Sequence, residues 1–362
     1  MKIAFYGSSL LSTYWNGAAT YYRGLLRALA GRGFDITFYE PDVYDRQKNR
    51  DLEPPSWCNV VVYEGTIDAM KRVAVEAGAA DIVVKASGVG FEDDLLLQEV
   101  MSSASAHALK IFWDVDAPAT LAELREDPGC PLRQALPALD IVLTYGGGDP
   151  VVSSYRALGA RQCAPIYNAL DPQTHYPVAP DTRFSADLGF LGNRLPDREA
   201  RVETFFLEPA ARLARQRFLL GGSGWHDKPL TDNVNYVGHV AERDHNAFNV
   251  SPRAVLNISR ASMAENGFSP ATRVFEAAGA GACLITDYWE GIERFLEPGR
   301  EVVVARDGKD VADALLALTR DDAAAIGTRA RERLLREHTY VHRAVEAEAA
   351  FCAAITRRKA AA

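Results

Sequence analysis

The chain has few features that mark a secreted or membrane protein. No apolar run approaches the roughly 20 residues that a membrane-spanning helix requires. Only four apolar residues separate Met1-Lys2 from Gly7-Ser8-Ser9, which is too short for a signal peptide. The five cysteines are an odd number, lie far apart and form no C-x-x-C pair. That pattern excludes the familiar zinc and redox spacings and disfavours a disulfide framework, so we expect a cytoplasmic protein with reduced, mostly buried cysteines.

Positive charge is also scarce. The 362 residues include 40 Lys and Arg against 48 Asp and Glu, a net charge of −8. This balance argues against a dedicated nucleic-acid binder, which carries a basic face. The first apolar segment is not followed by G-x-G-x-x-G, and no G-x-x-x-x-G-K-[ST] occurs, so neither a dehydrogenase dinucleotide site nor a P-loop is predicted.

Twelve short apolar segments alternate with helix-like stretches. Their continuous apolar character is typical of strands buried on both faces, and the alternation predicts parallel sheets in α/β domains. The segments in the first half are residues 2–6, 35–39, 60–63, 81–85, 109–113 and 140–145. Those in the second half are residues 188–191, 218–220, 234–237, 255–258, 283–286 and 302–305.

The length agrees with two domains at about 150 residues each. Prolines break regular structure at positions 172, 177 and 180. We therefore expect an N-terminal domain over residues 1–167, a C-terminal domain over 168–339, and a helix over 340–362 that packs back on the domains. The residues expected on one face of that helix are Val341, Ala344, Val345, Phe351, Cys352 and Ile355.

The stretch from residue 254 to 287 is the most informative, and it reads as strand, loop, helix, turn, strand. Ser269 and Pro270 predict a helix start, as N-cap and first helical residue. A helix N-terminus beyond a parallel strand binds anions through its free N–H groups. Thr272 and Arg273 would lie in the first turn, with Glu276 on the same side as Arg273. This set fits a nucleoside diphosphate; the alternative is a simple surface ion pair.

Two further segments are candidates for phosphate contacts. Gly192, Asn193, Arg194 and Arg198 follow the first strand of the second half. Glycine lets backbone approach a phosphate and arginine binds it with two N–H groups, although a solvated basic turn has the same composition. Gly222 and Ser223 end the next strand, and they form either another phosphate-binding turn or an ordinary tight turn.

Several longer segments resemble a known family. They are YYRGLLRALAGRGFDITFYEPD, FWDVDAP, IYNALDP, DLGFLGNRLPDR and GFSPATRVFEAAGAGACLITD. Over nearly the whole chain the sequence resembles CgeB-like, spore-maturation-related glycosyltransferases of the GT-B type, distantly related to the retaining family-4 enzymes. The resemblance implies two Rossmann-like domains that face each other across a cleft, the acceptor on the first and a nucleotide-sugar donor on the second.

The resemblance also implies roles for particular residues. In family-4 enzymes two glutamates flank seven residues and the second binds the donor ribose; Glu276 matches the second, whereas Phe268 stands at the first. The loop that begins at Gly192 matches loops that face the diphosphate. The remaining match is a loop whose main chain reads the nucleobase, here Val237, Gly238 and His239.

Asp114 and Asp116 form an Asp-x-Asp after an apolar strand. Alone, this pair suggests the Mg²⁺ or Mn²⁺ site of single-domain glycosyltransferases. The two-sheet pattern and the resemblance favour a metal-free reaction instead, with these carboxylates facing the acceptor and one of them a candidate base.

The sequence thus predicts a glycosyltransferase without metal or cofactor, hexosyl-transferring and retaining by resemblance. Its donor would be UDP-, GDP- or dTDP-linked, and its acceptor a glycan, a protein or a small molecule. Asp114, Asp116 and Arg273 are the predicted catalytic residues, Arg273 by stabilising the departing diphosphate. A nucleotide-sugar 2-epimerase and a non-catalytic coat or scaffold protein remain as alternatives.

Overall fold

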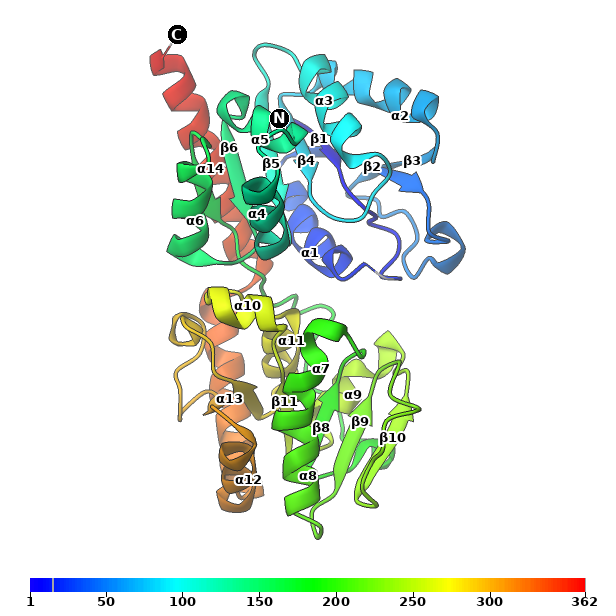
Figure 1. Cartoon of the computed structure of the whole chain (residues 1–362), viewed down its shortest axis with the longest axis vertical. Coiled ribbons are helices and arrows are strands. Elements are labelled where there is room, and N and C mark those ends of the chain that lie inside the picture. The colour runs from blue at the N-terminus through cyan, green and yellow to red at the C-terminus, as the bar shows by residue number, and fades with distance from the viewer. Residues whose placement is uncertain (15, 362) are drawn as a thin grey trace. The chain divides into compact units, whose positions relative to one another are not determined.

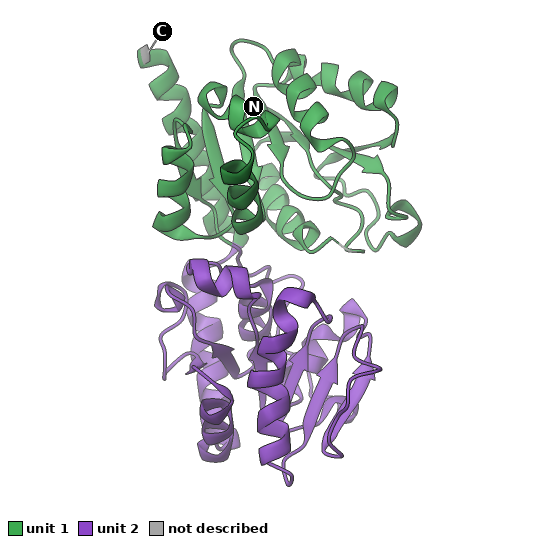
Figure 2. Cartoon of the chain, in the orientation of Figure 1, with its two compact units in different colours: residues 1–167, 340–362 green, residues 168–339 purple. Residues whose placement is uncertain are grey.

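A computed structural model describes residues 1–14 and 16–361. The chain divides into two compact units (Figure 2). The first comprises Met1–Tyr167 and Tyr340–Ala362, and the second comprises Asn168–Thr339. Each unit is built around one parallel sheet, so both have the α/β architecture predicted from the alternating pattern (Figure 1).

The first sheet has seven parallel strands. Their order is β3 (Asn59–Glu64), β2 (Asp35–Asp42), β1 (Lys2–Tyr6), β4 (Ile82–Ala86), β5 (Leu109–Asp114), β6 (Ile141–Thr144) and β7 (Cys163–Pro165). Six of them lie where the apolar segments predicted strands. The seventh was missed, because β7 is a three-residue edge strand that ends in proline and lacks an apolar run.

Helices cover both faces of this sheet. They are α1 (Ala18–Gly31), α2 (Ile67–Ala74), α3 (Asp93–Ser103), α4 (Ala117–Glu126), α5 (Pro131–Ala135), α6 (Gly148–Ala157) and α14 (Tyr340–Ala361). Adjacent strand residues point to opposite faces. Phe5 stacks on Phe38 on the face of α1 and α14, with ring centroids 5.2 Å apart. Tyr6 stacks on Tyr39 on the other face, with centroids 4.5 Å apart.

Helix α14 packs against α1 within the first unit, as expected of a C-terminal helix that returns to a domain. Gly24 permits the close approach, since a Cβ there would lie 2.1 Å from the Tyr340 ring. The predicted face of α14 is partly wrong: Val341 and Val345 are 62% and 47% exposed, and Cys352 is exposed as well. The buried face consists of Tyr340, Ala344, Ala347, Phe351 and Ala354. The small alanines allow the helix to approach the domain closely, and hydrophobicity alone does not indicate which face does so.

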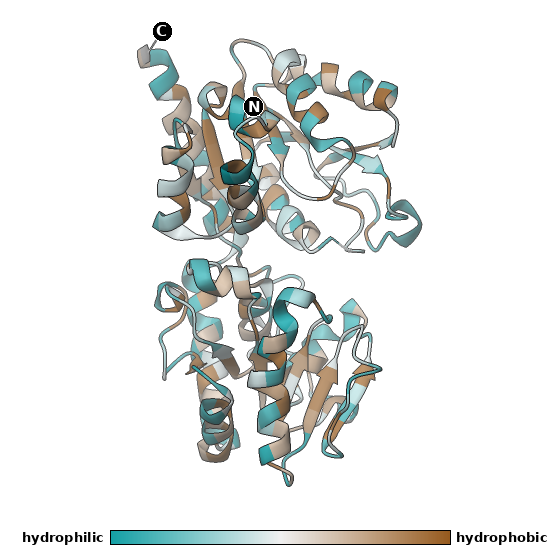
Figure 3. Ribbon diagram, in the orientation of Figure 1, coloured by the Kyte–Doolittle hydropathy of each residue, from teal (hydrophilic) through white to brown (hydrophobic). Residues whose placement is uncertain are grey.

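The second sheet has six parallel strands, and all six lie where they were predicted. Their order is β10 (Val234–Gly238), β9 (Phe218–Gly221), β8 (Leu188–Leu191), β11 (Ala254–Asn257), β12 (Leu284–Asp287) and β13 (Val303–Ala305). The helices are α7 (Pro196–Val202), α8 (Glu208–Arg212), α9 (His245–Val250), α10 (Ala261–Asn266), α11 (Thr272–Gly279), α12 (Gly308–Ala317) and α13 (Arg320–Glu337). The inner strands β8, β9, β11 and β12 are buried throughout and largely hydrophobic, as parallel strands covered on both faces must be (Figure 3), whereas the edge strands β10 and β13 are only partly buried.

Candidate functional site

The order of strands in the second sheet reverses between β8 and β11. Strand β8 is followed in the chain by α7, and β9 and β10 extend the sheet on its side. Strand β11 is followed by α10 and α11, and β12 and β13 extend the sheet on the other side. In open α/β sheets, ligands bind beyond the carboxyl ends of the strands at such a switch point. The candidate site of this unit therefore lies among the segments that follow β8 and β11.

The helix after β11 begins later than predicted. Helix α11 starts at Thr272, with Ala271 as its N-cap in extended conformation. Ser269 is buried and its hydroxyl donates to the carbonyl of Gly267 at 2.9 Å, so it does not cap the helix. Pro270 is buried too, and its carbonyl accepts from Asn168 Nδ2 at 3.2 Å. The predicted start at Ser269-Pro270 is wrong because these two residues anchor the loop, which leaves Thr272 and Arg273 as the first helical turn.

Two guanidinium groups come together at the switch point, Arg198 from α7 and Arg273 from α11. Burial lowers the pKa of Arg198 to about 10, and the positive charges of Arg273 and Arg260 add to the shift, only partly offset by Asp197 and Asp287. Among the described residues, buried Arg198 Nε has no hydrogen-bond partner. The arrangement is a partly buried concentration of positive charge that an anion would relieve.

Glu276 lies one turn beyond Arg273, with 15% of its side chain exposed. Its Oε2 is 3.9 Å from Arg273 Nη2, and Arg273 Nη1 also donates to Asn249 Oδ1 at 3.2 Å. Burial works to raise the pKa of Glu276, but His175, Arg273 and His245 outweigh it and hold that pKa below its ordinary value. The carboxylate is therefore ionised at neutral pH and able to accept hydrogen bonds.

The two histidines beside Glu276 were not predicted from the sequence. His175 is buried, with Nδ1 at 2.9 Å from the Thr174 hydroxyl. His245 starts α9, and burial followed by the charge of Arg273 lowers its pKa. Its Nε2 lies 3.2 Å from the carbonyl of Val240, so the neutral ring donates there and leaves Nδ1 as an acceptor. A lone histidine carries no signal in one sequence, and only the fold brings these two to Glu276.

Arg194 does not join this group. Its Nη1 is 2.9 Å from Asp227 Oδ1 and its Nη2 is 2.7 Å from Glu199 Oε1. The hydrogen bonds that Arg194 donates to these two carboxylates raise its pKa. The loop instead serves Arg198, whose guanidinium donates to the carbonyl of Asn193. Of the two arginines predicted after β8, only Arg198 lies beside Arg273.

The run that contains Gly222 and Ser223 forms a tight turn against the loop after β8. A Cβ on Gly222, which has φ +112°, would lie 2.3 Å from the carbonyl oxygen of Gly192. The Gly222 N–H donates to the Gly238 carbonyl at 2.7 Å, and the Ser223 N–H donates to Asn193 Oδ1 at 2.9 Å. Both N–H groups are thus engaged within the protein, which favours the tight-turn interpretation over phosphate binding.

The predicted base-reading segment lies at the end of β10. Val237 and Gly238 are half-buried, and His239 is exposed beyond the strand. The carbonyl of the next residue, Val240, holds His245, which faces Glu276. The side chain of His245 therefore connects the end of β10 to Glu276 and Arg273.

One buried acidic residue of this unit, Asp287, was not predicted from the sequence. Asp287 ends β12, is fully buried, and accepts from Arg201 Nη2 at 2.6 Å and from the Ser259 N–H at 2.9 Å. Burial raises the pKa of Asp287, although Arg201 and Ser259 work against that shift. These contacts link β12 to α7 and to the loop after β11, and they fix the positions of these segments at the switch point.

The surroundings of Asp114 in the first unit do not favour its predicted catalytic role. Its side chain has no exposed surface and accepts four hydrogen bonds. Their donors are the hydroxyls of Ser87, Thr120 and Tyr155 and the N–H of Asp116. Burial raises the pKa of Asp114 against the effect of these donors. The carboxylate is a structural anchor, and only the half-buried Asp116 could meet a ligand.

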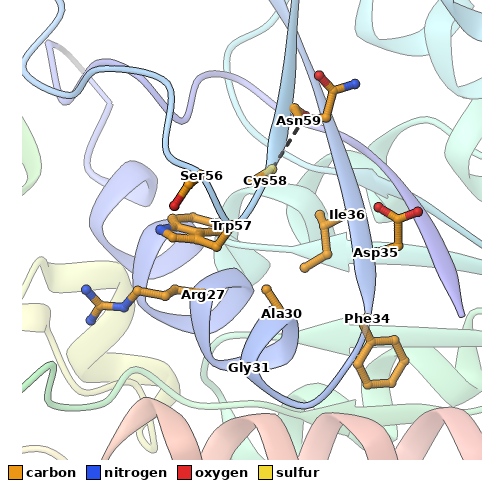
Figure 4. A pocket seen from close by; sticks show the side chains of 10 residues that line it. All are labelled: Arg27, Ala30, Gly31, Phe34, Asp35, Ile36, Ser56, Trp57, Cys58 and Asn59. Atoms are coloured by element: carbon orange, nitrogen blue, oxygen red, sulfur yellow. Dashed lines mark hydrogen bonds between the residues drawn. The ribbon is translucent and has the colours of Figure 1, made fainter.

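A wide groove of about 630 Å³ in the first unit lies away from the carboxyl ends of the strands (Figure 4). Asp35 and Asn59, which line it, are the first residues of β2 and β3. It therefore lies at the amino ends of those strands, and sheet topology assigns it no ligand.

Neither a cluster of metal ligands nor a membrane-spanning helix occurs in residues 1–14 and 16–361. Nowhere in these ranges do three or more His, Cys, Asp or Glu side chains gather as a possible metal site. Within the same part of the chain, none of the helices combines the length and apolar character needed to cross a bilayer.

Known proteins resemble this chain in part of its sequence and in its fold. The model of a family described as "Glycosyl transferase-like" matches residues 198–349, which include Arg198, Arg273 and Glu276. Sucrose-phosphate synthase from Thermosynechococcus elongatus has a TM-score of 0.71 at 13% identity, with all of both chains covered. HepE from Anabaena, solved with UDP and glucose, has a TM-score of 0.69 at 14% identity, covering 98% of this chain and 100% of its own.

The chain has the GT-B glycosyltransferase fold. At these identities the likeness shows the fold, and the family match reaches less than half of the chain. No curated protein matches the sequence.

Proposed function

We propose that this GT-B protein is a metal-independent, retaining glycosyltransferase of the cytoplasm that moves a hexosyl group from a nucleoside-diphosphate sugar to an acceptor hydroxyl, in the manner of the CgeB-like group. The observation that carries the proposal is the pair of partly buried arginines, Arg198 and Arg273, with ionised Glu276 one turn away. The family match and the UDP complex of HepE support it.

Each group has a distinct task in this reaction. Arg198 and Arg273 stabilise the negative charge that develops on the departing diphosphate. The N–H groups of Thr272 and Arg273 begin α11, where backbone donors have no acceptor within the helix, and they would bind the same anion. Glu276 accepts hydrogen bonds from the ribose diol, while Val237, Gly238 and His239 remain the proposed contacts of the base. Asp116 remains the proposed carboxylate on the acceptor side.

Isothermal titration with UDP, GDP and dTDP tests the donor site. We expect one of them to bind, and Arg273→Ala to weaken binding by roughly 30- to 100-fold, since charge-assisted bonds to an anion are lost. Arg243→Ala is the matched control, because Arg243 is 88% exposed on its side chain. Absence of binding by all three nucleotides, or equal effects of the two variants, would refute the assignment.

A ligand cycle tests Glu276 specifically. If its carboxylate holds the ribose diol, Glu276→Gln weakens UDP binding but has little further effect on 2′-deoxy-UDP. Independent losses from the variant and the deoxy ligand would remove the ribose role.

Product analysis separates the alternatives. A transferase releases nucleoside diphosphate and makes a glycoside, an epimerase yields an epimeric sugar without acceptor, and a scaffold turns over nothing. Activity that survives EDTA supports the metal-free reaction, and the anomeric configuration of the product tests retention.

A further inference from the structure

A small cavity lies beneath the carboxyl ends of β4 and β5 in the first unit, between α3, α4 and α5. Its volume is about 150 Å³, room for about five waters at ~30 Å³ each, or for one small ring. One wall is apolar and consists of Leu97, Phe112, Leu124 and Leu132. The cavity therefore suits a single-ring molecule with an apolar face.

Lys85 places an unsatisfied donor in this cavity. The residue is 3% exposed and lines the space at the end of β4. Its Nζ donates to Asp93 Oδ1 at 2.5 Å and to the Ala86 carbonyl at 2.7 Å. An ammonium has three N–H groups, and no residue described in the structure accepts the third. A hydroxyl oxygen of an occupant would satisfy it.

The rim of the cavity is acidic. Asp94 and Glu123 line it and are exposed, and neither has an ion pair with any of the described residues. Lys85 is the sole cation of the lining, and Asp93 already neutralises it. Two uncompensated carboxylates repel an anionic occupant and attract an ammonium group.

We propose that this cavity binds a monocyclic polyol bearing an amino group, an aminosugar or aminocyclitol, and that this compound is the acceptor. A ring hydroxyl faces Lys85, the ring lies along the apolar wall, and the ammonium lies between Asp94 and Glu123. The acceptor role rests on the proposed function; the binding does not. In the transfer, a hydroxyl oxygen bonds to the anomeric carbon, the bond from that carbon to the diphosphate breaks with its electron pair, and the hydroxyl proton goes to the diphosphate or to solvent.

Titration of the full chain without a donor tests the binding, with glucosamine, glucose and glucose 6-phosphate as probes. We expect glucosamine to bind about threefold to fivefold more tightly than glucose, the scale of an exposed ion pair, and glucose 6-phosphate not to bind. Glu123→Gln should remove most of that preference. Glu126→Gln, on the same helix but outside the cavity lining, should leave it unchanged.

Some outcomes would overturn the inference. They are binding of no probe, equal affinity for glucosamine and glucose, tighter binding of the phosphate, or equal effects of Glu123→Gln and Glu126→Gln. Leu124→Trp, which fills the cavity, should abolish glucosamine binding; if it fails to fold, Glu123→Gln still decides.

Titration of the same samples with UDP, GDP and dTDP keeps the two proposals apart. If one nucleotide binds and glucosamine does not, the cavity inference is wrong and the donor site stands. If glucosamine binds and no nucleotide does, the proposed function fails and the cavity is a binding site without an acceptor role.

Discussion

The two sheets have switch points of the same topology, but the charged side chains at these points have different surroundings. In the first unit the order reverses between β1 and β4, and the protein's own hydrogen bonds close the loops there. Buried Arg46 donates to the carbonyls of Ser8 and Val89, at 3.3 and 2.6 Å. In the second unit, Arg198 and Arg273 instead repel each other.

The difference concerns what each charge contacts. Buried Glu40 of the first unit accepts from the Ser9 hydroxyl at 3.0 Å and the Leu10 N–H at 2.5 Å, so it holds a loop. The carboxylates of Glu40 and Asp93 act on Arg46, whereas the strongest charge acting on Arg198 is the like charge of Arg273. A charge that the fold satisfies stabilises the free protein, and one that it leaves unsatisfied favours a bound anion. This difference is why we propose the donor site in the second unit.

The largest expected effect is that of Asp114→Ala. Loss of its carboxylate leaves several buried donors without an acceptor, so we expect the free energy of unfolding to fall by about 3–5 kcal/mol. Urea denaturation followed by circular dichroism measures it. Asp116→Ala, two residues away and half-buried, should cost much less. Unchanged stability of Asp114→Ala together with lost transfer would restore its catalytic role.

The next effect concerns the unsatisfied charge of the second unit. Arg198→Gln should weaken nucleoside-diphosphate binding by about 10- to 50-fold, because one charge-assisted contact is lost. It should hardly change the stability of the free protein, because the repulsion from Arg273 disappears with the charge. Calorimetric titration and urea denaturation of one preparation measure both. A large loss of stability with unchanged affinity would make Arg198 a structural residue like Arg46.

We expect His245 of the second unit to make the stability of the protein depend on pH under acidic conditions. Burial and Arg273 lower the pKa of His245 from 6.5 to about 4. Its contribution to stability is therefore complete above pH 6.5 and is lost as the pH falls toward 4. In His245→Gln the stability should fall less over this window, by roughly 1–2 kcal/mol. Parallel pH dependence of the melting temperatures of variant and parent would contradict this prediction.

Most of the fold could be predicted from the sequence, and less of the site. Buried parallel strands are continuous apolar runs, so twelve strands were found, whereas β7 has only three residues and no such run. The helix start at Ser269-Pro270 failed because Ser269 bonds within its loop, a tertiary outcome that local propensity does not contain. His175 and His245 reach Glu276 only through the fold. The burial of Asp114 could not be predicted, because an acid after a strand looks the same in the sequence whether it is exposed or surrounded by donors.

The smallest expected effect is that of Arg194→Gln, and it completes the comparison. The sequence predicted Arg194 and Arg198 equally, but Arg194 is bound by Glu199 and Asp227 and thus resembles the satisfied charges of the first unit. We expect its loss to change nucleoside-diphosphate affinity by less than about threefold, the range of an exposed ion pair. Titration beside Arg198→Gln makes the test, since the two variants remove the same charge four residues apart. Equal losses would show that both arginines contact the anion and that the ion pairs of Arg194 open when it binds.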